Sequence, residues 1–251
     1  MSIPFPEIIN LDSIFVWLMH RISEEFGDHA ILKGGIELRL LNCPRSTNDI
    51  DYIFVPYSSK KEITEGLDKI LKEIPNAEIF QTMNSKAVRI KIHVEGVSIQ
   101  IEASVSKECK AIAMSTNVLA GHVNQLGRIV SVMSLDVALS HKLAAWNERR
   151  LMRDLYDIYY LFDVVGEKPD METLNNRLKK VESRLPKLKK VKNMTLEEFI
   201  SELSDAAKNL TDEAVRKELS PLLDETELVG LDKKLKAALN KLVEFLSSIK
   251  K

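Results

Sequence analysis

Two aspartates, Asp49 and Asp51, are the residues whose types and spacing are best suited to chemistry. They open the segment DIDYIFVP, which has the composition of a buried strand ending at Pro56. Alternate residues of a strand share one face, so both carboxylates are expected to point the same way. Two like charges held so close are costly unless a cation lies between them. The pair therefore predicts a site for Mg²⁺ or Mn²⁺ that neutralises a triphosphate and activates a hydroxyl.

A third acid, Glu102, lies in the segment VSIQIEASV. Its position is out of phase with the apolar set Ile99, Ile101 and Ala103, so it projects from the opposite face of that strand. If this strand lies next to the one that begins at Asp49, Glu102 completes a carboxylate triad. It is then a candidate metal ligand and a candidate base for the acceptor hydroxyl.

Glycine is scarce, with nine in the chain, yet two stand together at Gly34-Gly35 between an expected strand and an expected helix. Such a turn lets backbone N–H groups approach an anion closely, and the start of a helix adds partial positive charge. Side chains suited to phosphate binding occur nearby. They are Lys33, Arg39, Arg45, Ser46 and Thr47.

The elements that must position these residues divide the chain in two. Apolar residues recur at helical spacing over 11–26, and 58–75 contains an amphipathic helix. Strict alternation over 88–105, with Glu95-Gly96 as a hairpin turn, predicts paired strands. The pattern is helical almost throughout after Ser134. We expect an α+β fold with a mixed sheet and flanking helices: a catalytic domain at 1–133 and a helical C-terminal domain at 134–251.

Composition narrows the classes of function. The net charge is −1 over 251 residues, so a nucleic-acid partner would need a local basic patch. No GxxxxGK[ST] occurs, which excludes a P-loop enzyme. Gly34-Gly35 lacks the later glycine of GxGxxG, which excludes a Rossmann dehydrogenase. No segment approaches the length of a membrane span, and the N-terminus lacks a basic signal region. We expect a cytoplasmic protein without a membrane partner.

Two stretches resemble the AbiEii-type nucleotidyltransferase toxins, a branch of the polymerase-beta-like superfamily that includes the MenT enzymes. LKGGIELRLLNCPRSTNDIDYIF is similar to their first motif, KGG(T/I)xLR followed by an Arg-Ser/Thr pair and DxD. HKLAAWNERRLMRDLYDIYYL is similar to their other signature, a Lys followed by an R-D-x-x-D helix. The resemblance implies transfer of a nucleotide from an NTP to RNA, in known cases the tRNA 3′ end. It also implies a cognate antitoxin.

The resemblance also assigns roles to single residues. Gly34 and Gly35 would hold the triphosphate, and the two aspartates of DxD would bind the metals. Arg45 and Ser46 would contact phosphates. The wider superfamily usually has Gly-Ser where this chain has Gly-Gly, so one hydroxyl contact to phosphate is missing here.

In the second motif the resemblance implies that Lys142 binds the nucleotide and that Asp154 or Asp157 is the functional acid. Lys142 and Asp157 are far apart in sequence, and a straight helix would separate them by about 22 Å. Either the helix breaks near Trp146-Asn147, or the two residues do different jobs.

A purely structural interpretation of this motif stays open. Arg150 and Arg153 precede Asp154 and Asp157 by four residues each. Pairs at this spacing stabilise a helix face. In that case neither aspartate has a chemical role.

The basic stretch from Arg177 to Lys192 contains one acid, Glu182. It is either a solvated helix face or the electrostatic footprint of an RNA acceptor. Three functions remain open from the sequence: nucleotide transfer to RNA, nucleotide transfer to a small molecule or protein, and nucleotide or RNA binding without turnover.

Overall fold

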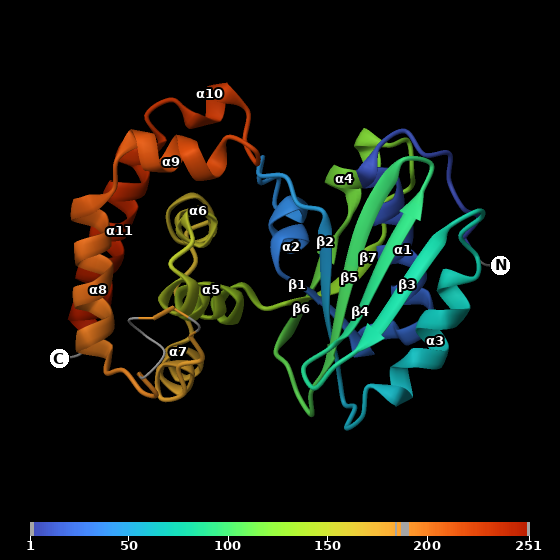
Figure 1. The fold of residues 1–251 in the computed structure, drawn as a ribbon, viewed down its shortest axis with the longest axis horizontal. Helices are drawn as coiled ribbons and strands as arrows, with labels where there is room; N and C mark the ends of the chain where they lie inside the picture. The colour runs from blue at the N-terminus through green and yellow to red at the C-terminus, as the bar shows by residue number, and fades with distance from the viewer. Residues whose placement is uncertain (1–2, 184, 187–190, 250–251) are drawn as a thin grey trace. The chain divides into compact units, whose positions relative to one another are not determined.

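The computed structural model describes residues 3–183, 185–186 and 191–249. The chain divides into two compact units, Met1–Ser134 and Leu135–Lys251, which are described separately (Figure 1). Strands occur in the first unit, whereas every element described in the second unit is a helix. The expected α+β fold class, a mixed sheet with flanking helices followed by a helical region, is confirmed.

Seven strands of the first unit form one mixed sheet in the order β3-β4-β5-β2-β1-β7-β6. The central strand β2 runs antiparallel to β1 and parallel to β5. The strands are β1 (Ala30–Lys33), β2 (Asp49–Phe54), β3 (Glu78–Met83), β4 (Val88–Val94), β5 (Val97–Val105), β6 (Ala111–Ser115) and β7 (Ile129–Met133).

The hairpin between β4 and β5 forms as its alternation predicts. Val94 pairs with Val97, and the two turn residues Glu95 and Gly96 have φ values of 47° and 78°. Positive φ at both central positions is the geometry of a tight turn whose twist matches that of the flanking strands. The turn fixes the register of the whole hairpin.

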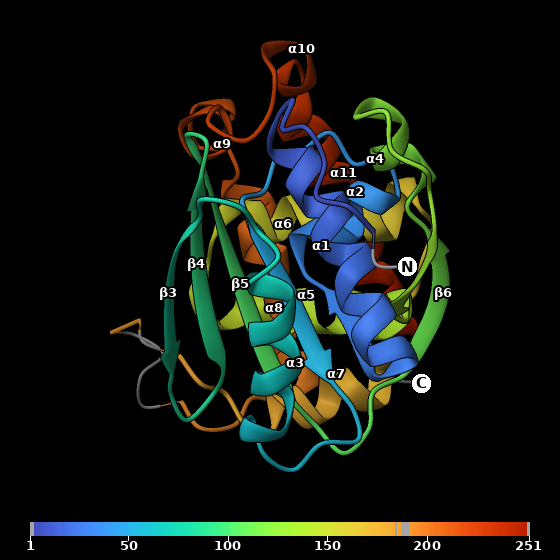
Figure 2. The same ribbon diagram turned by 90° about the vertical axis from the view of Figure 1, so that its right-hand side faces the viewer.

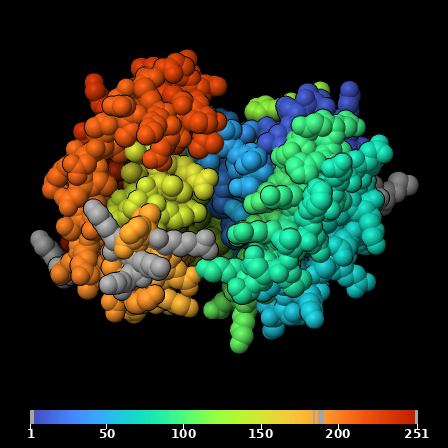
Figure 3. All heavy atoms as spheres, viewed as in Figure 1, coloured from blue at the N-terminus to red at the C-terminus, as the bar shows by residue number. Residues whose placement is uncertain are grey.

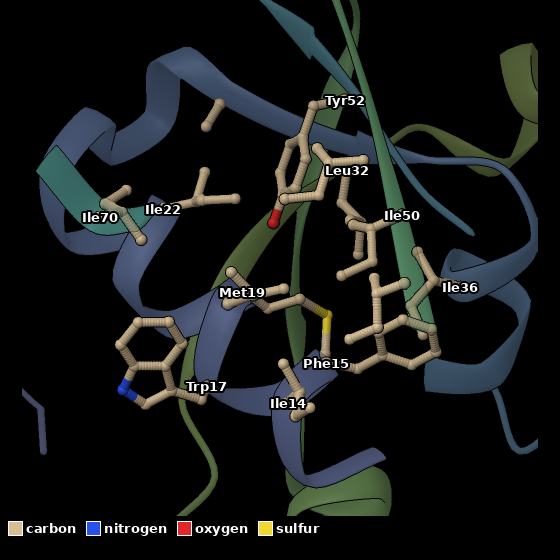
Figure 4. Packing of buried hydrophobic residues seen from close by; sticks show 14 of the residues in the cluster. Ile14, Phe15, Trp17, Met19, Ile22, Leu32, Ile36, Ile50, Tyr52 and Ile70 are labelled. Atoms are coloured by element: carbon tan, nitrogen blue, oxygen red, sulfur yellow. The ribbon is translucent and has the colours of Figure 1, made fainter. Parts of the chain in front are cut away.

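Helices of the first unit cover one face of the sheet. In Figure 2, α1 and α3 lie in front of it. Ile50 and Tyr52 of β2 and Leu32 of β1 pack with α1 side chains such as Phe15 and Met19 in one buried cluster (Figure 4). The helical segments of this unit are α1 (Leu11–Phe26), a 3-10 turn (Gly27–His29), α2 (Gly35–Leu40), α3 (Lys61–Leu71) and α4 (Asn117–His122).

The second unit is built from amphipathic helices around its own core, where Trp146 and Phe199 pack edge to face with ring centroids 6.2 Å apart. Thr195 and Glu198 form a capping box at the start of α8. No helix in the described part of the chain is long and apolar enough to cross a membrane. The helices are α5 (Leu135–Arg149), α6 (Met152–Tyr159), a π-helical turn (Tyr160–Val164), α7 (Met171–Leu178), α8 (Leu196–Asn209), α9 (Asp212–Leu219), α10 (Glu225–Leu228) and α11 (Leu231–Ile249).

Candidate active site

Asp49 and Asp51 lie on the face of β2 that points away from the core. Burial along the strand alternates: Ile50 and Tyr52 are almost completely buried, while both aspartates keep partial exposure. Alternation of side chains along a strand therefore places the two carboxylates on the same face. The apolar residues that anchor β2 are what orient the acids.

Glu102 lies directly beside Asp51, because β5 pairs with β2 in the register Asp51↔Glu102. The same row continues on both sides, with Lys33 opposite Asp51 on β1 and Arg89 opposite Glu102 on β4. Residues in register on neighbouring strands share a face. Four charged side chains thus cross the sheet in the order Lys33, Asp51, Glu102, Arg89, with the two acids side by side and a basic residue on each flank.

Arg89 holds the carboxylate of Glu102. Its Nε donates to Oε2 of Glu102 at 2.8 Å, and the Glu102 side chain keeps 29% exposure. A charge-assisted bond of this kind orients an acid but also neutralises it. Sequence reasoning missed Arg89, although the two-residue turn at Glu95-Gly96 places it opposite Glu102.

Gly34 makes room for Asp51. It is the N-cap of α2 with φ of 87°, and a Cβ added there would collide with Oδ2 of Asp51. The left-handed φ and the missing side chain both call for glycine. The first glycine of the pair therefore positions a carboxylate as well as turning the chain.

Gly35 packs against the loop that leads into β2. A Cβ there would lie 2.8 Å from Nη2 of Arg45 and 3.0 Å from Oγ1 of Thr47. Arg45 is 6% exposed and donates from Nη1 to the Ser46 carbonyl at 3.1 Å. The Thr47 hydroxyl accepts from the Asp49 backbone N–H at 3.3 Å. The structure thus brings the glycine pair, the Arg-Ser-Thr segment and DxD together.

Two other polar residues of this region, Arg39 and Cys109, are placed in ways that do not suit catalysis. Arg39, grouped by its sequence position with the phosphate-binding candidates, instead donates to Asp12 of α1 at 2.6 Å. Burial raises the pKa of the Cys109 thiol to about 11, with Glu37 raising it further and Lys33 opposing the shift. A thiol with so high a pKa is protonated at neutral pH and is a poor nucleophile.

In the second unit, Lys142 and Asp157 form an ion pair, Nζ to Oδ2, at 2.6 Å. The helix breaks, as one of the two expectations required, but at Arg150-Leu151 and not at Trp146-Asn147. Arg150 has φ of 57°, so the chain reverses between α5 and α6. Lys142 is 16% exposed and Asp157 only 2%, which makes the pair largely buried.

Asp154 belongs to a separate pair. Arg149 donates to both of its carboxylate oxygens, from Nη2 at 2.6 Å and from Nε at 3.2 Å. Burial raises the pKa of Asp154, and the charges of Arg149 and Lys142 oppose that rise. The Asp154 side chain is 2% exposed, whereas that of Arg149 is 47% exposed.

The helix-face pair of Arg150 with Asp154 is wrong, because Arg150 lies in the break between α5 and α6. The Arg150 guanidinium lies 4.3 Å from the centre of the Trp146 ring and 3.0 Å from the Glu202 carboxylate. Both acids instead use partners that lie before the break. Sequence reasoning missed Arg149, since the break that delivers it has no glycine or proline.

Part of the basic stretch lies outside the described residues, including Arg184, Lys187 and Lys189. Arg177, at its start, is paired with Glu148 at 3.0 Å and contacts His141. The described arginine of this stretch therefore has a structural role within its own unit.

Among the described residues, no group of three or more His, Cys, Asp and Glu side chains forms a ready-made metal site. The donor chemistry of β2 nevertheless suits magnesium, since both aspartates share one face of the strand and keep partial exposure. Mg²⁺ is commonly held by one or two carboxylates plus substrate phosphates, and does not need a complete protein cage.

Comparison with known proteins agrees with this architecture. The family model described as nucleotidyl transferase AbiEii toxin, type IV toxin–antitoxin system, matches residues 17–241. No curated protein sequence gives a significant match. MenT4, a nucleotidyltransferase toxin from Mycobacterium tuberculosis, is similar with a TM-score of 0.59 and 16% identity, over 94% of this chain and 82% of that one. JHP933 from Helicobacter pylori is similar with a TM-score of 0.51 and 14% identity, over 97% and 98% of the two chains.

The matching family model defines the class of this protein, a nucleotidyltransferase, and the mixed sheet agrees with it. The family match covers most of the chain, so this protein belongs to the AbiEii nucleotidyltransferase toxins of type IV toxin–antitoxin systems.

Proposed function

We propose that this enzyme transfers a nucleotide from an NTP to the 3′ hydroxyl of an RNA acceptor, a tRNA in the first instance. One observation carries the proposal: Asp49 and Asp51 share the open face of β2, with Gly34 against Asp51 and Glu102 in register beside it. The first unit is then the catalytic domain, 1–133 in our sequence-based division.

Asp49 and Asp51 would hold Mg²⁺ or Mn²⁺, with Glu102 as the third acid. When bound, the metal would neutralise phosphate charge and lower the pKa of the attacking hydroxyl. The bond from Arg89 engages Oε2 of Glu102, so the carboxylate would take part through Oε1. A carboxylate has lone pairs enough to keep one bond to arginine while it accepts a proton or binds a cation.

The remaining residues of the first unit bind and orient the NTP. Backbone N–H groups of the Gly34-Gly35 turn, the Lys33 ammonium, the Arg45 guanidinium and the Ser46 hydroxyl provide donors for phosphate oxygens. Arg45 is held by the backbone of its own loop, so its guanidinium is already oriented. This pre-organisation lowers the ordering cost of binding the triphosphate.

The reaction is an in-line displacement at the α-phosphorus. The acceptor 3′ oxygen forms a bond to the α-phosphorus, and its proton passes to the Glu102 carboxylate. The bond from the α-phosphorus to the bridging oxygen breaks, and pyrophosphate leaves with that oxygen. The products are RNA longer by one nucleotide and pyrophosphate.

Within the second unit, the candidates from the family motif are Lys142 and one of the two buried acids. The ion pair orients the Lys142 ammonium, so we propose that Lys142 binds the nucleotide and that Asp157 positions it. Asp154, which is paired with Arg149, is the alternative acid.

The test is transfer of label from each NTP in turn to total tRNA, with Asp49→Asn and Asp51→Asn as variants. Asp68→Asn is the matched control, because Asp68 lies on α3, which packs on the opposite face of the sheet. We expect label on tRNA with the wild type and the control, and loss by at least about 100-fold in both site variants.

The assay also separates the other functions. Label on a small molecule or protein in the same extract would replace RNA as the acceptor. Metal-dependent nucleotide binding without pyrophosphate release would indicate a binding module. The toxin family further leads us to propose an antitoxin partner, whose co-expression should relieve growth arrest caused by the wild type and not be needed for Asp51→Asn.

A further inference from the structure

The open face of the sheet continues beyond the acids as far as the edge strand. The register places Asp49 beside Gln100 on β5, Gln100 beside Lys91 on β4, and Lys91 beside Phe80 on β3. Partners in register share one face, so these four side chains form a row across the sheet. With strands about 4.8 Å apart, Lys91 lies roughly 10 Å from Asp49 and Phe80 one strand further.

Basic side chains occupy the β4 part of this face. Arg89, Lys91 and His93 alternate with the buried Ile90 and Ile92, and all three are exposed. Arg89 uses its Nε for Glu102, and its guanidinium carries two further nitrogens that can donate. The side chains of β3, β4 and β5 form surface of the first unit in Figure 3.

Phe80 is an exposed aromatic ring beside these basic residues. Its exposure is 58%, and its ring meets that of His93 edge-on, with centroids 6.1 Å apart. A T-shaped contact covers at most one flat face of the phenyl ring, and so leaves a face for stacking. An exposed aromatic next to basic residues on a sheet face is how proteins bind single-stranded nucleic acid.

We infer that the surface formed by Phe80, Arg89, Lys91 and His93, here the β3–β4 face, binds the single-stranded 3′ segment of an RNA acceptor. A base stacks on Phe80, and Lys91 and Arg89 contact phosphates. The row Phe80, Lys91, Gln100, Asp49 then leads the strand toward the acids. This inference rests on the proposed function, because it takes the 3′ hydroxyl to be the attacking group.

Binding of a short, labelled single-stranded RNA, followed by fluorescence anisotropy, tests the inference without turnover. We expect Phe80→Ala to weaken binding roughly tenfold. Lys91→Glu should weaken it and lower the slope of log affinity against log salt by about one. The control for Phe80 is Ile79→Ala on the opposite face of the same strand. The control for Lys91 is Lys72→Glu, which makes the same charge change at the end of α3.

The outcomes separate the surface from the reaction. Weaker RNA binding in both variants and not in the controls supports the surface, even if the wild type transfers no nucleotide and the proposed function fails. Unchanged RNA affinity in both variants at low salt overturns the surface, and normal label transfer in the same variants would leave the proposed function standing. Absence of RNA binding by the wild type overturns the surface as well.

Discussion

Lys142 and Asp157 are brought together by a reversal of the chain at Arg150, and their side chains meet at 2.6 Å. A straight helix would have kept them about 22 Å apart. The pair is largely buried, so each charge stabilises the other away from water. An ammonium held in this way has a fixed position and limited access to water.

Loss of one member of the Lys142–Asp157 pair should strongly destabilise the protein. We expect Lys142→Met to lower the free energy of unfolding by roughly 3–5 kcal/mol, because the buried Asp157 carboxylate loses the ammonium that it contacts at 2.6 Å. Chemical denaturation measures the effect. The control is Lys208→Met, whose partner Asp205 is mostly exposed, and the expected change there is below about 1 kcal/mol. Equal changes in the two variants would show that the buried ion pair contributes no more to stability than an exposed one.

Substitution of the two acids of the second motif should reduce activity to different extents. We expect Asp157→Asn to reduce label transfer more than Asp154→Asn, because Asp157 holds the Lys142 ammonium. Asp154 binds Arg149, and burial already raises its pKa, so a neutral amide relieves part of the cost of burying charge. Steady-state kinetics with thermal melting of each variant makes the comparison. A larger loss with Asp154→Asn would transfer the role to Asp154.

Gly34 should be irreplaceable for activity. Gly34→Ala adds a Cβ that collides with the Asp51 carboxylate, and we expect transfer to fall roughly 100-fold. Gly96→Ala is the matched control, since φ there is 78° and a Cβ would meet nothing within 4 Å. Both variants should lose about 1–2 kcal/mol of stability from backbone strain. Activity and melting temperature measured on the same preparations separate strain from displacement of the acid.

We expect the free energy of unfolding to fall in acid because of His20. Burial, reinforced by the charge of Arg128 and opposed by that of Glu24, lowers its pKa from 6.5 to about 4. The unfolded chain then binds the proton more tightly than the folded chain, so stability falls as pH drops from about 6.5 to about 4. The full effect is roughly 3 kcal/mol.

Urea titrations at several pH values across this range measure how steeply the free energy of unfolding depends on pH. His20→Asn keeps a polar group near Thr116, which the imidazole Nε2 contacts at 2.8 Å, and removes the titration. We expect the variant to show a flatter pH profile, whereas an asparagine at the exposed His122 should leave the wild-type profile unchanged. The same acid slope in wild type and His20→Asn would rule out His20 as its source.

Local patterns predicted the geometry of the first unit well. Alternation placed Glu102 on the opposite face from Ile101, and the turn at Glu95-Gly96 fixed the pairing of β4 with β5. The position of β5 beside β2 was a condition that sequence alone did not settle, because parallel pairing joins segments far apart in the chain.

The second motif was harder to predict, because its geometry depends on tertiary contacts. The Arg150 side chain contacts Trp146 of α5 and Glu202 of α8, and these contacts stabilise the reversal. The sequence between Lys142 and Asp157 contains no glycine or proline that would have predicted the break. Arg39 shows the same limit, since its partner Asp12 lies on another helix and could not be recognised from neighbouring residues.

The alternation along β2 has a genetic consequence. One codon added or removed within residues 49–54 would shift the phase of the strand and exchange its two faces. The carboxylates would then turn into the apolar layer and the isoleucine and tyrosine would turn out, so solubility and catalysis would be lost together. A codon added in the loop at 55–60 would leave that phase intact. Reading-frame-preserving insertions should therefore be depleted in the strand and tolerated in the loop among clones selected only for soluble expression.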